Sequence, residues 1–234
     1  MSGFPRYLSA EERRAMIVRS VLELAAVQDP LEITTAAIAG RMGLSQAAVF
    51  RHFSSKDQVW LAVMEWVAAE FFARVERASA SAPDPMAALE AVFMAHVGFA
   101  DEFPGVPRML FGELQRIDPT PVKHAARGLM EKYGRLLTSV LERGKGAGRV
   151  DASLATPVAA SMFIGCIQGL MVRALLTGDL GLMLKAAPQT FSLFRRAVER
   201  PDCGISGLNA ADRTGPAAAA TERESASQHA WEEK

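Results

Sequence analysis

An all-α fold is predicted by the composition of the chain and by the spacing of its apolar residues. Half of the 234 residues are hydrophobic, which is enough for a sizeable core. Residue types that favour helices dominate, and Val and Ile form no alternating runs of the kind that strands show. We therefore expect about nine helices: three short ones in front, a long connecting helix and a larger helical body.

Capping residues and helix breakers place these helices along the chain. Two pairs have the spacing of a capping box, in which a serine caps the helix start and a Glu or Gln three residues later bonds back: Ser9 with Glu12, and Ser55 with Gln58. Three others show a cap before a helix-starting proline: Asp84-Pro85, Thr120-Pro121 and Thr156-Pro157. The predicted helices span residues 9–27, 34–42, 46–53, 55–79, 85–100, 106–116, 121–143 and 157–176, with a last one to about residue 199.

Net charge and the cysteines restrict the class of protein. The 26 basic and 26 acidic residues balance, so charge must be read locally. Cys166 and Cys203 are the only cysteines and lack metal-like spacing, which argues against a disulfide framework and fits a reducing cytoplasm. The four histidines form no metal-binding motif, so we expect no enzyme activity, no cofactor and no metal.

Neither a signal peptide nor a membrane span is predicted. The N-terminus lacks the apolar segment of a signal peptide. The longest apolar run, Val158 to Val172, is interrupted by Ser161 and Gln168 and is shorter than the ~20 residues of a membrane helix. We therefore expect this run to be a buried helix of a protein that does not enter the membrane.

The segment from Thr34 to Phe53 has the pattern of a helix-turn-helix. Two short apolar-periodic helices flank Gly43, Leu44 and Ser45. The glycine can adopt the left-handed conformation that ends the first helix, and Ser45 can cap the second. Thr34 and Thr35 are expected to cap the first helix.

In such a motif the second helix lies in the major groove of DNA. Its N-terminal residues, which would contact base edges, are Ser45, Gln46, Ala47 and Ala48. Gln46 can donate to and accept from adenine, and the alanine methyl groups can contact thymine. Three residues that follow can contact phosphates: Arg51, His52 and Lys56. Thr34 and Thr35 at the start of the first helix can also hydrogen-bond the DNA backbone. No Asp or Glu occurs from Ile33 to Lys56, so this region is basic within a neutral protein.

The spacing alone leaves an alternative open, because many α-proteins contain short helix pairs joined by glycine. A resemblance favours DNA binding. The stretches AEERRAMIVRSVLELAA and ITTAAIAGRMGLSQAAVFRHFSSKDQVW, within residues 10–71, resemble the N-terminal domain of TetR/AcrR-family transcriptional regulators. The resemblance implies DNA contacts by Thr35, Ser45, Gln46, Ala47, Phe50, Arg51, His52 and Lys56. Phe50 departs from the family, which commonly has Tyr there, and cannot donate a hydrogen bond to a phosphate.

For the rest of the chain, the resemblance implies a helical ligand-binding and dimerisation domain. The helix over 157–176 is apolar on nearly every side and must be covered on every side. Its own domain can cover one face, and a second copy of the chain the other. Residues of the last helix that could complete this surface are Phe191, Leu193, Phe194 and Val198. A helix that is central in a monomer is the alternative.

A pocket would be lined by Met and Phe side chains of the middle helices, which suit adaptable apolar sites. The wider set of candidates is Met64, Phe71, Phe93, Met94, Phe99, Met109, Phe111, Met130, Tyr133, Met162 and Cys166, with His96, Tyr133 and Gln168 as polar groups. The residues predicted to contact a ligand are Phe93, His96, Met109, Met130, Tyr133, Met162 and Cys166. The alternative is ordinary core, which is the more frequent role of Met and Phe stripes at helical spacing.

Four segments follow: a flexible arm (1–8), a helix-turn-helix DNA-binding domain (9–55), a ligand-binding and dimerisation domain (56–200) and a disordered tail (201–234). The predicted function is a homodimeric repressor that binds a palindromic double-stranded DNA operator and responds to a small apolar or aromatic effector. Two alternatives remain: a constitutive DNA-binding regulator without a ligand, and a helical small-molecule-binding protein.

Overall fold

A computed structural model describes residues 9–179 and 181–200. The predicted arm (1–8) and tail (201–234) lie outside the described residues. The all-α fold is confirmed for the described part, which contains nine α-helices and a short 3-10 helix. They are α1 (Ala10–Val27), η1 (Pro30–Glu32), α2 (Thr35–Arg41), α3 (Gln46–Phe50), α4 (Lys56–Ala80), α5 (Pro85–Glu102), α6 (Gly105–Gln115), α7 (Pro121–Gly146), α8 (Thr156–Thr177) and α9 (Gly181–Val198).

The predicted helix starts are largely confirmed by their hydrogen bonds. Ser9 and Glu12 bond each other's backbone N–H groups in a full capping box. Ser55 accepts from the N–H of Gln58, but the structure shows no reciprocal bond, so only half of the second capping box forms. Asp84 and Thr120 cap α5 and α7 as predicted. Thr156 does not cap α8, because it is the first residue of that helix and Ala155 holds the N-cap position.

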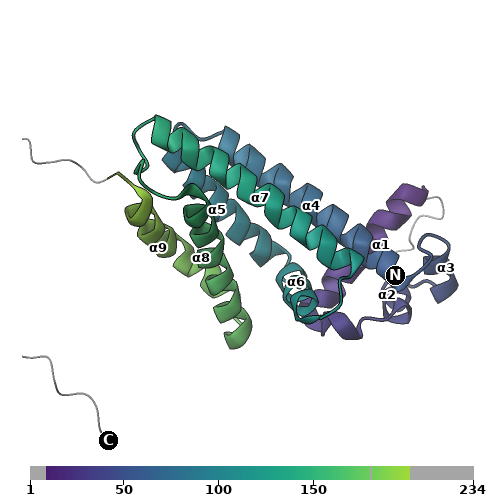
Figure 1. Cartoon of the computed structure of the whole chain (residues 1–234). Helices are drawn as coiled ribbons and strands as arrows, with labels where there is room; N and C mark the ends of the chain where they lie inside the picture. The colour runs from purple at the N-terminus through teal and green to yellow at the C-terminus, as the bar shows by residue number, and fades with distance from the viewer. Residues whose placement is uncertain (1–8, 180, 201–234) are drawn as a thin grey trace, which may run out of the picture. The chain divides into compact units, whose positions relative to one another are not determined.

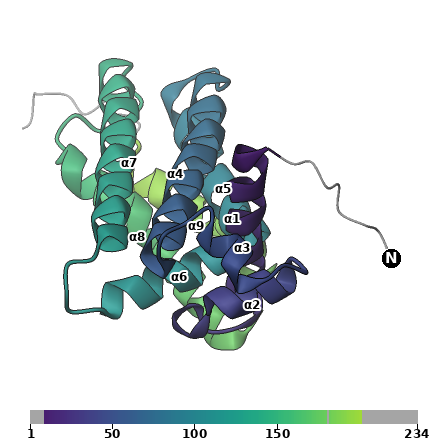
Figure 2. The same ribbon diagram turned by 90° about the vertical axis from the view of Figure 1, so that its right-hand side faces the viewer.

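The long helix α4 joins the front helices to the body. Helices α1, α2 and α3 gather near the start of α4, and α7 runs along α4 (Figures 1 and 2). The described residues belong to one compact unit, so α4 continues from the front helices into the body without a break. The domain boundary at residue 55 stays a prediction.

Helix α5 forms the centre of the body, because it packs against α4, α7, α8 and α9. It buries Phe93, whose ring contacts Phe163 of α8 and Phe191 of α9 at centroid distances of 5.3 and 5.5 Å. The last helix contains Pro188 without a break, since it continues from Gly181 to Val198.

Helix α6 connects the body to the front helices. It packs against α1 and η1 on one side and against α7 on the other. Gly105 allows the close approach to α1, because a Cβ atom there would lie 2.6 Å from the carbonyl oxygen of Leu22. Any larger residue at this position would separate the two helices.

Among the described residues, α8 alone is long and apolar enough, by length and composition, to cross a membrane. Here it packs against α9, α7 and α5, and 39% of its most apolar 18-residue window is buried. The incomplete burial leaves one apolar face uncovered.

Candidate DNA-binding surface and ligand cavity

The turn between α2 and α3 has the predicted geometry. Gly43 has a φ of +65°, a left-handed conformation that glycine adopts without strain. The N–H of Leu44 donates to the carbonyl oxygen of Ala39 at 2.9 Å, which closes the turn. Ala39 and Val49 are buried between the helices. The opposite side of α3 therefore faces outward.

Gln46, the predicted base reader, is exposed on α3 and held in place. Its amide Nε2 donates to the hydroxyl of Thr35 at 2.6 Å. Thr35 itself is only 8% exposed and holds the Gln46 side chain, so its contact with DNA stays a prediction. Thr34 caps α2 by accepting from the N–H of Ala37 at 3.1 Å. The amide oxygen of Gln46 has no protein partner among the described residues.

The other α3 residues differ in exposure. Ser45 stands at the helix start but makes no capping hydrogen bond, contrary to the prediction, so its hydroxyl is available to another partner. Ser45 and Ala47 are exposed, whereas Ala48 is half-buried. Phe50 is 45% exposed, an uncommon position for a phenyl ring without a partner surface.

Four basic side chains cluster beside the end of α3. Partial burial, and then the nearby guanidinium groups of Arg13, Arg51 and Arg14, lower the pKa of His52. Arg14 also donates to the carbonyl oxygen of His52 at 2.8 Å and stacks over Phe53 at 4.3 Å. The sequence prediction missed Arg13 and Arg14 as part of this surface. Both lie in the helix predicted over residues 9–27, outside the acid-free stretch from Ile33 to Lys56 on which the prediction rested.

Two other cations near the motif are engaged within the protein. Arg41 forms an ion pair with Glu23 of α1 at 2.9 Å. Lys56 donates from Nζ to the carbonyl oxygen of Leu31 at 3.2 Å and lies 5.9 Å from the Trp60 ring centroid. Lys56 is therefore turned toward η1, and a phosphate contact would require its side chain to leave this position.

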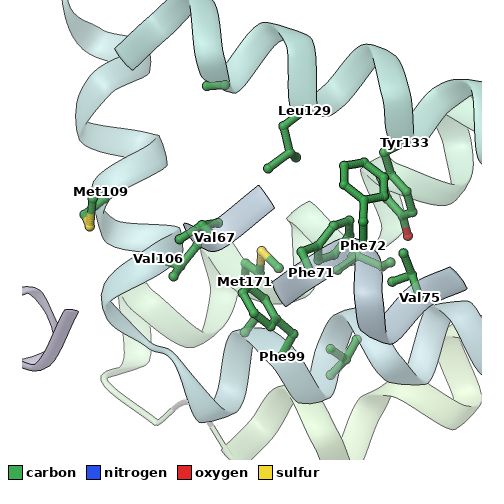
Figure 3. Close-up of a cluster of buried hydrophobic side chains, with 14 of the residues drawn as sticks. Val67, Phe71, Phe72, Val75, Phe99, Val106, Met109, Leu129, Tyr133 and Met171 are labelled. Carbon is green, nitrogen blue, oxygen red and sulfur yellow. The ribbon is translucent and has the colours of Figure 1, made fainter. Parts of the chain in front are cut away.

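A cavity of about 350 Å³ lies in the helical body. Helices α4, α5, α6, α7 and α8 contribute to its lining, and Figure 3 shows six of the lining side chains: Val67, Phe71, Phe99, Val106, Leu129 and Met171. The cavity is also lined by apolar residues of α6 and α8, among them Leu110, Phe111 and Ile164. Such a volume and lining are typical of small-molecule sites.

The residues predicted to contact a ligand only partly line this cavity. His96 and Met130 do, and so do Phe71, Phe99, Phe111 and Gln168 of the wider set. The other residues predicted to contact a ligand do not line the cavity: Phe93, Met109, Tyr133, Met162 and Cys166. Phe93 and Tyr133 are completely buried core, Met109 lines a separate cleft beside η1, and Met162 is exposed on α8. Helical periodicity identified the apolar face of each helix. It could not show where two facing helices leave a space between them.

His96, which lines the cavity, forms a buried polar pair with Tyr133 of the core. The Nδ1 atom of His96 lies 3.1 Å from the Tyr133 hydroxyl, and the Phe71 ring packs edge-on against both. Burial lowers the pKa of His96 to about 3 and raises the pKa of the Tyr133 hydroxyl. His96 is therefore neutral at physiological pH.

This pair predicts an acid-dependent loss of stability. Unfolded histidine has a pKa near 6.5, so below that pH the unfolded chain binds a proton at His96 that the folded chain does not bind until about pH 3. As the pH is lowered from 6.5 to about 3, this difference in proton binding at His96 should reduce the free energy of unfolding by up to about 1.4 kcal/mol per pH unit. Urea unfolding of the wild type and His96→Gln at pH 7.5, 6.5 and 5.5 measures the contribution. Carboxylates act equally in both proteins, so parallel stability curves would contradict the assignment.

One face of α8 remains apolar and exposed. Val158, Met162, Val172 and Leu176 recur on the same side of the helix, with 67, 40, 43 and 83% of each residue exposed. Gly165 and Gly169 lie between them, and a Cβ atom added at either would meet no heavy atom of the neighbouring elements within 4 Å. On α9, Leu193 is 60% exposed, whereas Phe191, Phe194 and Val198 are buried within the chain and do not extend the surface as predicted.

The fold and the α2–α3 geometry define a helix-turn-helix DNA-binding protein with a hollow helical body. Residues 17–63 match the model of the bacterial regulatory proteins of the tetR family. This match covers the helix-turn-helix segment and agrees with the resemblance in the sequence. Among the described residues, no group of three or more His, Cys, Asp or Glu side chains could hold a metal ion.

Known proteins resemble the chain well beyond the motif. Nucleoid occlusion factor SlmA of Alteromonas mediterranea is 26% identical over 157 residues, which cover 67% of this chain and 80% of that protein. A TetR-family regulator of Agrobacterium tumefaciens superposes with a TM-score of 0.71 at 20% identity, over 82% of this chain and 100% of its own. Regulator FadR of Bacillus subtilis, solved with stearoyl-CoA, gives 0.69 at 15% identity, over 77% of this chain and 96% of its own.

Proposed function

We propose that the chain is a homodimeric cytoplasmic repressor, without enzymatic activity, that binds a palindromic operator and is released by a small effector. The proposed response to a ligand rests on the apolar cavity of about 350 Å³ in the body. This volume falls within the range of about 300–1,000 Å³ for small-molecule sites. The cavity favours a ligand-responsive protein over a constitutive regulator with a filled core. The ligand-bound FadR structure supports the same choice.

Helix α6 supplies a route from the cavity to the DNA-binding helices. Val106 and Leu110 line the cavity, while Gly105 at the start of the same helix contacts α1. A ligand that shifts α6 would therefore shift α1 and the helices packed on it. To convert a mostly DNA-bound population into a mostly DNA-free one, the ligand must bind the DNA-free conformer more favourably than the DNA-bound conformer by about 5.5 kcal/mol.

The exposed face of α8 supports the dimer. A second copy would cover Val158, Met162, Val172 and Leu176, and the two glycines between them would allow the helices to approach closely. A dimer with a twofold axis through this face has two copies of α3, the helix predicted to lie in the major groove. The two helices of a dimer should then lie about 34–36 Å apart along DNA, or a multiple of it, and read a palindrome.

A gel shift with the DNA upstream of its own coding region tests the proposal. The wild type should bind a short segment specifically, and the logarithm of its affinity should fall linearly with the logarithm of salt concentration. Binding that does not distinguish this segment from an unrelated duplex of equal length would overturn it.

One variant in α3 and one at its C-cap should separate base reading from phosphate contact. Gln46→Ala should weaken operator binding by roughly 5- to 150-fold and leave binding to unrelated DNA nearly unchanged, because a bidentate base contact contributes about 1–3 kcal/mol of discrimination. Arg51→Ala should weaken both DNAs alike and reduce the salt slope by about one. Fluorescence anisotropy at several salt concentrations measures both.

The matched control for these variants is Gln115→Ala, which removes an exposed amide at the end of α6. It should bind both DNAs as the wild type does. Equal losses from Gln46→Ala on both DNAs would remove the base-reading assignment.

The likeness to nucleoid occlusion factor SlmA supports a second candidate function. In that case the DNA-bound chain would act in nucleoid occlusion and not on transcription. Mapping its binding sites in cells separates the two: sites confined to promoters favour the repressor, and sites without relation to promoters favour the second candidate.

A further inference from the structure

The wall of the cavity is asymmetric in charge. Its lining is mostly apolar, and its polar members are His96, Lys123, Arg127 and Gln168. No Asp or Glu belongs to the lining. Two cations without a carboxylate among the lining residues make the electrostatic potential at this wall positive, which favours an anionic group.

The two cations stand together at the outer side of the cavity. Lys123 and Arg127 are four residues apart on α7, so their side chains share one face. Arg127 is exposed and Lys123 half-buried, whereas Phe71, Phe99 and His96 at the inner side are buried. The cavity therefore has a cationic mouth and an apolar interior.

Neither cation is neutralised by a carboxylate in the described part of the chain. The ion pairs of α7 involve Lys132 and Lys145, and none includes Lys123 or Arg127. Lys123 donates from Nζ to the carbonyl oxygen of Arg116 at 2.6 Å, which orients the ammonium group and leaves two of its protons for another acceptor.

We infer that the cavity binds an amphipathic anion, with its apolar part inside and its carboxylate or phosphate between Lys123 and Arg127. This inference rests on the proposed function of the cavity as the effector site. Charge-assisted hydrogen bonds to the two cations hold the anionic group, and burial of the apolar part supplies the remaining affinity. A cationic amphiphile meets two like charges at the mouth and is rejected.

The volume limits the apolar part. If each CH2 group occupies about the space of one water molecule, roughly 30 Å³, a cavity of about 350 Å³ holds on the order of twelve such groups. Medium chains of about eight to twelve carbons fit this space. Each added CH2 should tighten binding by roughly fourfold until the cavity is filled.

Four probes with the same ten-carbon chain test the inference by calorimetry, each below its micellar concentration: decanoate, decyl phosphate, decanol and decyltrimethylammonium. Decanoate or decyl phosphate should bind at least roughly tenfold tighter than decanol, and the quaternary ammonium most weakly. The order of the two anions tells carboxylate from phosphate. Equal affinity for decanoate, decyl phosphate and decanol, or tightest binding of the cation, would overturn the inference.

Substitutions of the two cations test where the anionic group of the ligand binds. Arg127→Gln and Lys123→Gln should each weaken decanoate roughly tenfold or more and leave decanol unchanged. Arg135→Gln, the same change on an exposed α7 residue outside the cavity lining, should behave as the wild type. Ala126→Phe, which fills the cavity, should abolish binding of every probe while circular dichroism shows a folded helical protein. Probe binding that survives Ala126→Phe would locate the site elsewhere.

Operator binding is measured on the same preparations. Specific DNA binding with no probe bound would refute the ligand class and leave the DNA-binding proposal standing. Probe binding with no specific DNA binding would refute the repressor proposal, whereas the site itself would stand.

Discussion

Gly105→Ala is expected to destabilise the chain by about 1–3 kcal/mol, because the added methyl group cannot be accommodated between α6 and α1. The new Cβ would lie 2.6 Å from the carbonyl oxygen of Leu22 and 2.9 Å from the Cβ of Ala25. Both obstacles belong to α1: the first is backbone and the second a methyl group, and neither can rotate away. The two helices must separate, which loosens the contact between the body and the DNA-binding helices.

Thermal unfolding measures this effect, with a fall in Tm of about 2–4 °C for each kcal/mol in a chain of this size. Gly112→Ala on the same helix is the matched control, since a Cβ there meets nothing within 4 Å. The control should be neutral or stabilising by up to about 1 kcal/mol, because alanine is the better helix former. Equal Tm values for the two variants would show that α6 and α1 are not in tight contact.

The same variant tests the coupling route. Displacement of α1 changes the position of α2 and α3, so Gly105→Ala should alter operator affinity although the residue is on α6, outside the α2–α3 motif. Gly112→Ala should leave the affinity unchanged. Operator affinity equal to the wild type in a folded Gly105→Ala protein would argue that the cavity communicates with DNA by another route.

Val172→Lys is expected to convert a dimer into monomers and to reduce operator affinity by about 10²-fold or more. A lysine at this point of the α8 face would place two charges, one from each copy, in an apolar interface. Once the copies separate, each recognition helix binds its half-site alone, and the gain of about 10²–10⁴-fold from linking two sites is lost. Sedimentation at micromolar concentration gives the mass, and anisotropy gives the affinity.

Ile117→Lys is the control for this variant. Ile117 lies between α6 and α7 and is 96% exposed, so the same kind of substitution there should change neither mass nor affinity. A wild type that sediments as a monomer, or a Val172→Lys protein that stays dimeric, would remove α8 from the proposed interface.

Local rules in the sequence were sufficient for the helices and the motif. Capping residues such as Ser9 and Asp84, and the left-handed Gly43, act over three or four residues, so their spacing predicts where helices begin and end. The same spacing predicted an outward α3 with Gln46 on its exposed side. These interactions require no knowledge of the distant parts of the chain.

Only the tertiary structure decided which predicted residues are free to act. Thr35 is buried and positions Gln46, and Lys56 bonds to Leu31, both through contacts between residues more than ten positions apart. The apolar faces of α4, α5 and α7 were evident from periodicity, but whether they meet or enclose a space depends on how the helices cross. For that reason Phe93 proved to be core, and Lys123 and Arg127 emerged at a cavity mouth that no local pattern indicates.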